Sequence, residues 1–414
     1  MSFKFATLSS CALLLAAQAQ AAIDPAPVKF GGFELIPTLS VDQVHDDNVT
    51  MANDKEPTTK DISSWVTIVA PELQLGLKTD KSEYNLGYKL AAGRYTSSRD
   101  DDYVDHFVNA DAAWQLSSRN KLAVRGNYDR AHEDRGSDTS GDIVPNRALQ
   151  TPDEYESSIL GGTYTFGADT TPGRLVLDLE DYDKKYTNHR DTTRERDRNE
   201  QKATGTFYWS ISSATKFLAE GEYTDIDYDQ SRPADVRRGD YDGSLARAFV
   251  GVEWNITGKT TGTVKLGYQE KEFDSTSRKD YDGSSWDVAM TWSPKTYSVF
   301  TLSSGNKPQE SSGIGDFIDA ENITLGWQHG WSDSINSSVY VMTLSEDYVN
   351  SFNNRSDDSV NAGVSIDYTI KRWVSVSLAY DYSERDSRVD APALPLSSFD
   401  FDRNKFTLGV DLSF

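Results

Sequence analysis

The sequence predicts an all-β protein, a transmembrane antiparallel up-and-down β-barrel of the outer membrane with about 18 strands (16–18). Three observations lead to this fold class. Apolar and polar residues alternate with period two in many segments, the connections between segments alternate between short and long, and tryptophans gather beside the short connections. Period-two alternation separates the two faces of a strand, and outer-membrane barrels present an apolar face to lipid and a polar face to the lumen.

The chain begins with a predicted secretion signal over residues 1–21. Lys4 is followed by an apolar run and then by the small-residue cleavage motif Ala19-Gln20-Ala21. This run is too short to remain as a transmembrane helix. Its removal would also remove Cys11, the one cysteine of the chain, so we expect a mature protein without disulfides or cysteine-based metal sites.

The composition favours one barrel domain over residues 22–414. After the signal there is no run of about 18 apolar residues, which a membrane-spanning helix needs. A net charge of -23 and 26% charged residues fit a wet lumen and polar loops, whereas 11% aromatic residues argue against a disordered chain. No proline-rich, glycine-rich or like-charged linker divides this region.

The alternating pattern occurs in eighteen segments, and single-chain outer-membrane barrels have even strand numbers. We expect the apolar set of each segment to face lipid. In one of them Tyr340, Met342 and Leu344 form this set. In chain order the segments are residues 33–41, 65–77, 84–90, 108–116, 122–128, 160–166, 175–179, 207–211, 217–223, 248–256, 264–268, 286–292, 300–302, 323–327, 340–344, 360–370, 374–380 and 406–414.

The connections predict which rim faces which compartment, because short turns are periplasmic and long loops extracellular in such barrels. The chain should therefore begin and end at the short-turn rim. Short connections are residues 79–81, 117–120, 212–214, 257–259 and 293–295, and long charged ones are 46–61, 131–153, 188–199, 230–242, 306–316 and 385–399. Seven tryptophans beside the short turns resemble an aromatic girdle, namely Trp114, Trp209, Trp254, Trp292, Trp327, Trp331 and Trp373.

The last residues, Phe406 to Phe414, have apolar side chains at alternate positions up to the terminal phenylalanine. This ending resembles the β-signal that the outer-membrane assembly machinery recognises in its clients. We therefore expect that machinery, outer-membrane lipid and lipopolysaccharide to be partners of the chain.

No catalytic or cofactor-binding pattern is present, and we predict that the protein is not an enzyme and holds no cofactor and no metal ion. Nucleophile-elbow, zinc-protease and phosphate-loop motifs do not occur. Two Asp-Tyr-Asp-Gly sequences, at 240–243 and 280–283, lack the twelfth-position glutamate of a calcium loop. The histidines lack ligand spacing, and they are His45, His106, His132, His189 and His329.

The face opposite the apolar register supplies the candidate pore-lining residues, among which acids outnumber bases. A barrel of about 18 strands is wide enough for an aqueous channel, and an acidic lumen favours cations and neutral solutes. Alternatively, the charges pair across strands and fill the lumen as a plug of salt bridges. The candidates are Asp111, Arg125, Asp129, Glu180, Glu222, Arg247, Glu253, Lys265, Asp367 and Asp381.

One long connection, residues 131–153, is a candidate gate for the lumen. Gly136, Gly141 and Pro145 would allow it to fold back into the barrel. A mobile surface loop is an equally good interpretation of the same residues.

The start of the mature chain, Gly32 to Leu39 with Pro37, followed by Asp46-Asp47-Asn48, resembles the opening strand and first loop of the putative β-barrel porin 2 family. In that family a Gly-x-x-x-x-Pro strand leads into a loop that carries Asp-Asp-Asn. The resemblance implies an outer-membrane protein encoded with exopolysaccharide or capsule synthesis machinery, which helps the polymer across the outer membrane.

Three functions therefore stay open. The resemblance favours a conduit or accessory for exopolysaccharide or capsule export, with the polysaccharide and a periplasmic export protein as partners. The polar lumen favours a general diffusion porin that prefers cations. The acidic loops favour a closed structural or adhesive surface barrel. In each case we expect the protein in the outer membrane of a Gram-negative cell and no nucleic-acid partner.

Overall fold

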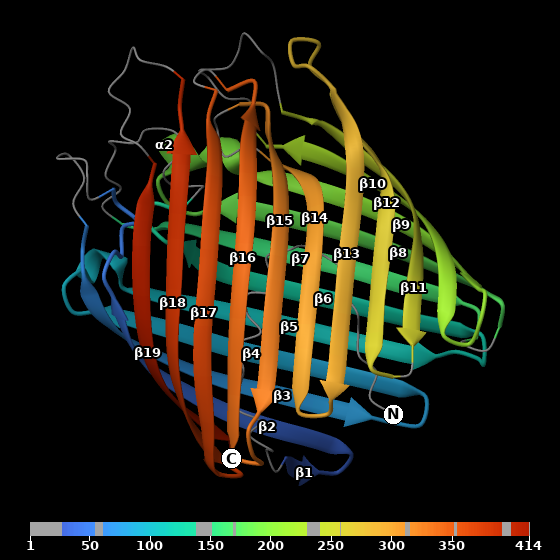
Figure 1. Cartoon of the computed structure of the whole chain (residues 1–414), viewed down its shortest axis with the longest axis horizontal. Helices are drawn as coiled ribbons and strands as arrows, with labels where there is room; N and C mark the ends of the chain where they lie inside the picture. The colour runs from blue at the N-terminus through green and yellow to red at the C-terminus, as the bar shows by residue number, and fades with distance from the viewer. Residues whose placement is uncertain are drawn as a thin grey trace.

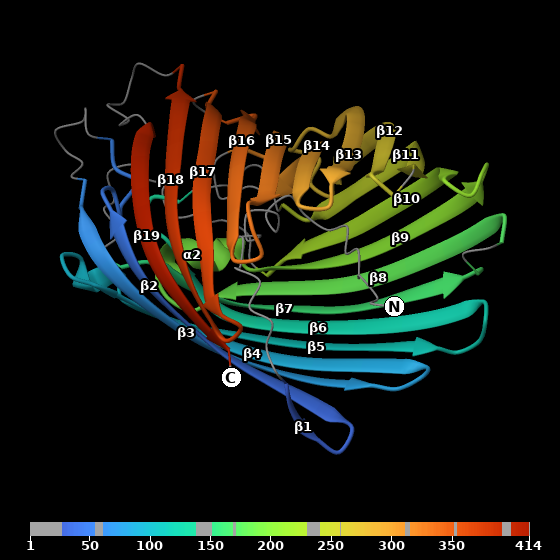
Figure 2. The same ribbon diagram turned by 60° about the horizontal axis from the view of Figure 1, so that its bottom comes forward.

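The computed structural model describes residues 27–413 except 54–60, 138–150, 169–170, 230–240, 257, 311–314, 352–353 and 391–398. The predicted signal, residues 1–21, lies outside the described residues. The strands form one antiparallel sheet in chain order, and pairing of the last strand with β2 closes it (Figures 1 and 2). Eighteen of the described strands, β2 to β19, make the wall, which confirms the predicted fold class and strand number.

The wall strands are 13 to 16 residues long, which is enough to cross a bilayer at the tilt of a barrel strand. No helix within the described ranges has the length and apolarity needed to span a membrane. The elements are β1 Val28–Phe30, β2 Phe33–Asp46, β3 Ser64–Lys78, β4 Ser82–Tyr95, η1 Arg99–Asp101, β5 Tyr103–Gln115, β6 Asn120–Glu133, β7 Asp153–Phe166, β8 Gly173–Tyr186, α2 Arg190–Thr193, η2 Arg194–Arg196, β9 Arg198–Ser210, β10 Thr215–Tyr228, β11 Gly243–Ile256, β12 Thr260–Phe273, β13 Tyr281–Lys295, β14 Ser298–Glu310, β15 Phe317–Gly330, β16 Ile335–Val349, β17 Ser356–Lys371, β18 Val374–Arg388 and β19 Phe401–Ser413.

The two rims of the barrel differ as the sequence predicts. Tight connections such as 79–81, 211–214 and 372–373 lie at the lower rim in Figure 1, and the longer connections lie at the upper rim. β1 and the end of β19 are both at the short-turn rim. β1 pairs with the start of β2, and it therefore extends the sheet below the last residues of β19.

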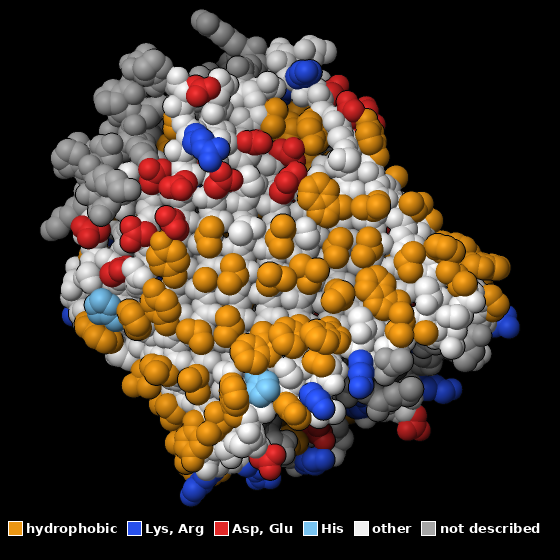
Figure 3. Space-filling view, viewed as in Figure 1, with side chains coloured by type: hydrophobic (Ala, Val, Ile, Leu, Met, Phe, Trp, Pro, Cys, Tyr) orange, Lys and Arg blue, Asp and Glu red, His pale blue; other side chains and the backbone are white. Residues whose placement is uncertain are grey.

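The outer surface carries an apolar belt between two polar zones (Figure 3). Leu266 lies near the middle of this belt with 61% of its surface exposed, and its partners on the neighbouring strands are Val250 and Trp286. Exposed apolar side chains on this scale are unusual in a water-soluble monomer but are what a lipid-facing wall requires. Other exposed members of the belt are Leu86, Val124, Leu160, Val364, Leu378 and Leu408.

The predicted lipid-facing register is wrong for β16. Met342 is 7% exposed, and Tyr340 and Leu344 also point inward, whereas Val339 and Val341 are 37% and 42% exposed on the outer surface. Residues 339–342 are all apolar or aromatic, so the alternation that identifies a face is lost there. Cross-strand pairing determines which face of β16 points outward, because Val339 is opposite the exposed Val364.

One predicted connection, and the first part of another, are strand in the structure. β13 continues through residues 293–295 by a register shift, and its turn lies at 296–297. β14 continues past Asn306 to Glu310 in spite of Pro308. The last regular pair between β13 and β14 involves Gly305, so the missing N–H of Pro308 faces no ladder partner on that side.

Candidate functional site in the barrel lumen

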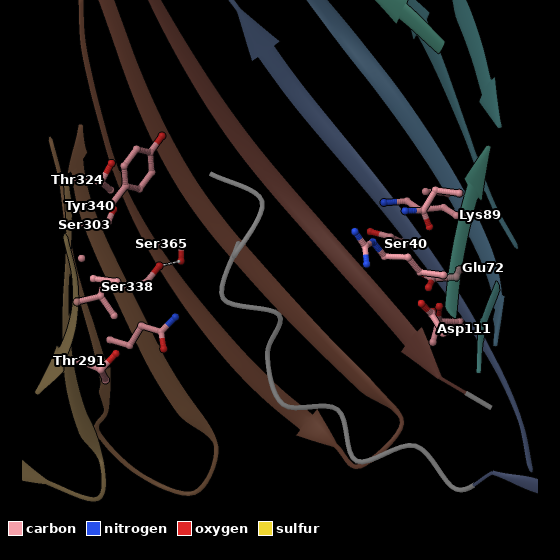
Figure 4. A pocket seen from close by; sticks show the side chains of 18 of the residues that line it. Ser40, Glu72, Lys89, Asp111, Thr291, Ser303, Thr324, Ser338, Tyr340 and Ser365 are labelled. Atoms are coloured by element: carbon pink, nitrogen blue, oxygen red, sulfur yellow. Dashed lines mark hydrogen bonds between the residues drawn. The ribbon is translucent and has the colours of Figure 1, made fainter. Parts of the chain in front are cut away.

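The interior holds a cavity of about 2580 Å³ to which every wall strand except β10 contributes residues. It runs from the short turns, where Lys81 lines it, to Tyr95 and Arg403 near the long loops. Inward side chains are predominantly polar because the outward set of each strand is the apolar one. Figure 4 shows two unlike sides, with hydroxyl groups such as Ser303 on one and charged groups such as Lys89 on the other.

The structure divides the ten candidate residues into five that line the cavity, four that lie outside it in ion-pair networks on the lumen side of β6 to β13, and Asp129, for which neither holds. A pore-lining role stays a prediction for all ten. The cavity group is Asp111, Arg125, Glu253, Asp367 and Asp381. The remaining residues are Glu180, Glu222, Arg247 and Lys265, which have the ion pairs described below, and Asp129, two strand positions beyond the cavity-lining Asn127.

Arg125 organises the ion pairs of β6 to β9. Its guanidinium donates two parallel hydrogen bonds to Asp178, both 2.9 Å, and one of 2.7 Å to Glu180. Glu180 also lies 3.1 Å from the Nζ of Lys202. A bidentate arginine–carboxylate pair is strong and directional, so this network fixes the side of the cavity that it lines.

A second network fills the lumen between β10 and β14. Glu310 accepts hydrogen bonds from the Nζ of Lys271 at 2.6 Å and from the Oη of Tyr228 at 2.8 Å. Arg247 is 3.6 Å from Glu222 and donates to the carbonyl oxygen of Asn306. Lys265 pairs with Glu220 at 2.9 Å and Asp287 at 3.2 Å. These ion pairs and the cavity thus occupy different parts of one lumen.

The long-loop rim is crossed by a third network, which involves the start of the candidate gate. Arg403 of β19 donates a bidentate pair to Asp46 of β2 and reaches Asp134, just after β6, at 3.2 Å. Arg385 of β18 lies 3.4 Å from the carbonyl oxygen of Gly136. The rest of the gate, including Gly141 and Pro145, lies outside the described residues.

Gly136 has to be glycine in this conformation. Its φ is +79°, and a Cβ there would lie 2.2 Å from the carbonyl oxygen of Thr50. The backbone of residues 134–137 therefore packs directly against the loop that follows β2, on the inner side of the rim.

His132 at the end of β6 lies between two carboxylates, with its ring nitrogens 3.0 Å from Asp105 and 3.4 Å from Asp134. Asp134 follows β6. Burial would raise the pKa of Asp134, yet the hydrogen bond of His132 and the charge of Arg403 hold it well below its ordinary value.

A repeated contact at the long-loop rim escaped the sequence analysis. The last residue of an ascending strand donates its N–H to an aspartate that precedes or begins the next strand, as from Tyr95 to Asp102 at 2.7 Å. A recognisable signal exists in the sequence, because an aromatic residue usually ends the first strand. The same contact joins Tyr186 to Asp197, Tyr228 to Asp242 and Phe273 to Asp280, and in β18 the penultimate residue Ser387 donates to Asp400 in the same way.

The histidines do not converge on one site. His106 and His329 face outward, where His106 lies beside Tyr88 and His329 beside Trp327 and Trp331. Within the described part of the chain, no group of three or more His, Cys, Asp or Glu residues is arranged to hold a metal ion.

Comparison with known proteins gives one family. The family model described as "Putative beta-barrel porin 2" matches residues 20–414. No curated protein sequence matches the chain. Solved structures with a similar arrangement include the outer membrane protein opdK from Pseudomonas aeruginosa, with 12% identity, coverage of 92% of this chain and 99% of that one, and a TM-score of 0.46. The siderophore receptor PirA from Acinetobacter baumannii has 8% identity, coverage of 91% and 80%, and a TM-score of 0.45.

Proposed function

This chain belongs to the putative beta-barrel porin 2 family, and on that premise we propose that it is a conduit, or an accessory of a conduit, for export of exopolysaccharide or capsule across the outer membrane. It is a porin-like outer-membrane β-barrel. The export role follows from what the family resemblance implies and is supported by the lumen. We propose no enzymatic role.

The observation that carries this proposal is the size and lining of the cavity. A volume of about 2580 Å³ exceeds the roughly 300–1,000 Å³ of ordinary small-molecule sites. It extends along the barrel rather than forming a compact pocket, and serines, threonines and tyrosines from most of the wall strands are among the residues that line it. An extended, hydroxyl-lined space suits a long polyhydroxylated molecule better than one small solute.

A general diffusion porin is the second candidate, and one observation favours it. Asp42, Asp111, Asp367, Asp381 and Asp411 line the cavity without a salt bridge to any described residue. Unpaired carboxylates would attract small cations into an open channel. The third candidate, a closed structural barrel, is favoured by the ion pairs that fill the lumen around Glu310.

We also propose the partners that this role requires. They are lipid and lipopolysaccharide around the apolar belt, the assembly machinery that recognises the alternating sequence from Phe406 to Phe414, the exported polysaccharide, and a periplasmic export protein at the short-turn rim.

Deleting the gene in its own host tests the role. Export predicts less polymer at the cell surface while synthesis continues, so that polymer accumulates in the periplasm or synthesis is feedback-inhibited. The wild-type gene should restore surface polymer. A Thr324→Trp gene, with the bulky residue in the cavity, should restore less than a Thr343→Trp gene, with it on the exposed outer face of β16.

Two results together would contradict export. They are normal surface polymer in the deletion strain and a steady, open, cation-selective conductance of the purified barrel in planar bilayers. That combination would favour the general diffusion porin.

A further inference from the structure

One row of inward residues crosses β13 to β18 at the level of Tyr340. Cross-strand pairing joins Thr291 to Thr301, Thr301 to Gly326, Gly326 to Tyr340, Tyr340 to Gly363 and Gly363 to Asp381. Two glycines in this row leave the wall without side chains on either side of Tyr340. Each of the other four residues lines the cavity.

The Tyr340 ring packs against the backbone of Gly363 on the neighbouring strand. A Cβ at Gly363 would be 2.3 Å from the Cε1 of Tyr340 and 2.5 Å from the Oδ1 of Asp381. Beyond the glycine, the Tyr340 hydroxyl donates to the same Asp381 oxygen at 2.8 Å. The ring is therefore held along the wall rather than projecting freely, and its hydroxyl is anchored at the far end.

On the side away from Asp381, the cavity lining next to this ring is uncharged. Among the described residues of β12 to β16, every side chain that lines the cavity is neutral, and most are hydroxyls, such as Ser303, Thr324 and Ser338 (Figure 4). Ser303 and Thr324 are direct cross-strand partners, and Ser338 lies 2.8 Å from Ser365, oxygen to oxygen. With strands about 4.8 Å apart and like-facing residues about 6.7 Å apart, these hydroxyls form a regular grid.

The opposite side of the cavity carries charge. Asp42, Glu72, Lys89 and Asp111 line it on β2 to β5. Asp42 and Asp111 have no salt bridge to a described residue, and neither has Asp381 at the end of the tyrosine row. The cavity therefore keeps excess negative charge, which repels a polyanion and tolerates a neutral chain.

Resting on the proposed export function, we propose that Tyr340, held over Gly363 by Asp381, is a contact site for the sugar rings of an uncharged polysaccharide. The apolar face of a sugar ring packs on the aromatic ring, and its hydroxyls exchange hydrogen bonds with Asp381 and the hydroxyl grid. Many equivalent hydroxyls offer similar hydrogen-bond partners at successive positions, so no single position binds the polysaccharide much more tightly than the others. Binding strong enough for entry and weak enough for exit is the condition for passage through a pore.

Equilibrium binding of two oligosaccharide probes to the purified full-length mature barrel in detergent tests this site without requiring conductance. The probes are maltoheptaose, which is neutral, and a heptamer of galacturonic acid, which has the same number of sugar units and is anionic. The neutral probe should bind at least tenfold more tightly at low salt. An Asp42→Asn, Asp111→Asn double variant should narrow that difference, because it removes two carboxylates without a salt bridge to a described residue from the side of the cavity opposite Tyr340.

Gly363→Ala is the diagnostic variant, because its methyl group would displace Tyr340 from the wall. It and Tyr340→Ala should each weaken maltoheptaose binding by about threefold to tenfold, the range of a lost aromatic contact. Gly221→Ala is the matched control, since a Cβ there meets nothing within 4 Å. Each variant is first checked for the heat-dependent gel shift of a folded barrel.

Any one of three results would overturn the inference. They are equal or tighter binding of the anionic probe, no measurable binding of maltoheptaose, and wild-type affinity for maltoheptaose in folded Gly363→Ala. The deletion experiment is independent of these results. A deletion strain that loses surface polymer while the barrel prefers the anionic probe would refute the neutral-polymer site and leave the export role intact.

Discussion

At the scale of the residue, side-chain direction separates lipid from lumen, and two residues on neighbouring strands show the contrast. Leu266 of β12 is in the middle of the apolar belt, whereas Glu253 of β11 lines the cavity and accepts a hydrogen bond of 2.6 Å from Lys216. We predict that Leu266→Arg lowers the free energy of unfolding by about 2–4 kcal/mol, the cost of a cationic side chain near the bilayer midplane. Glu253→Arg should still assemble, because water reaches its side chain.

Folding yields into phospholipid vesicles, read from heat-dependent gel migration, compare these two variants. Similar yields for both would mean that the two faces of β11 and β12 are assigned incorrectly.

Single residues also show where prediction from sequence ends. The face of Leu266 could be predicted because polar neighbours alternate with it, whereas Tyr340 could not be placed because Val339 and Val341 are also apolar. Local pattern alone leaves two registers of similar hydrophobicity, and only pairing with β15 and β17 selects one. The residue on which the sugar-contact inference depends was therefore the one assigned to the wrong face.

At the scale of the element, the ends of the ascending strands share a stabilising contact. The Asp102 carboxylate accepts the N–H of Tyr95, a group that the ladder leaves without a strand partner at the rim. We predict that Asp102→Ala speeds amide hydrogen exchange at Tyr95 by about tenfold or more, because a hydrogen bond to a charged group contributes about 1.5–3 kcal/mol. The exposed Asp100→Ala is the control.

Site-resolved hydrogen exchange of the folded barrel checks this contact. Unchanged protection of Tyr95 in Asp102→Ala, with the rest of the barrel intact, would show that the carboxylate is not the acceptor that matters.

Two predicted connections that contain prolines differ from the structure. They are residues 293–295 with Pro294 and 306–316 with Pro308, and proline lacks a ladder donor. In the structure Pro294 falls within a register shift of β13, and Pro308 lies where β14 has parted from β13, so neither interrupts a required hydrogen bond. Tight turns at 79–81 and 211–214 were predictable because each joins two clear period-two segments.

At the scale of the whole molecule, strand number, closure and the sorting of turns were predictable because each follows from a pattern that repeats along the chain. The division of the lumen into an ion-paired part and a cavity was not predictable. Whether Glu310 meets Lys271 and Tyr228 depends on residues of β10, β12 and β14 that only closure brings together. The same holds for the open side, where the hydroxyl grid and the charged wall come from opposite ends of the sequence.

The central claim is that an exported polysaccharide passes through the cavity on the hydroxyl side of this lumen. Photo-crosslinking in polymer-producing cells tests it most directly, with a photoreactive amino acid placed at Thr324 in the cavity or at Thr343 on the outer face of the neighbouring strand. We expect polysaccharide to be crosslinked to the barrel through the photoreactive residue at position 324 and not through the one at position 343. Folded, surface-located barrel that gives no polysaccharide adduct at 324 while the same cells export polymer would contradict it.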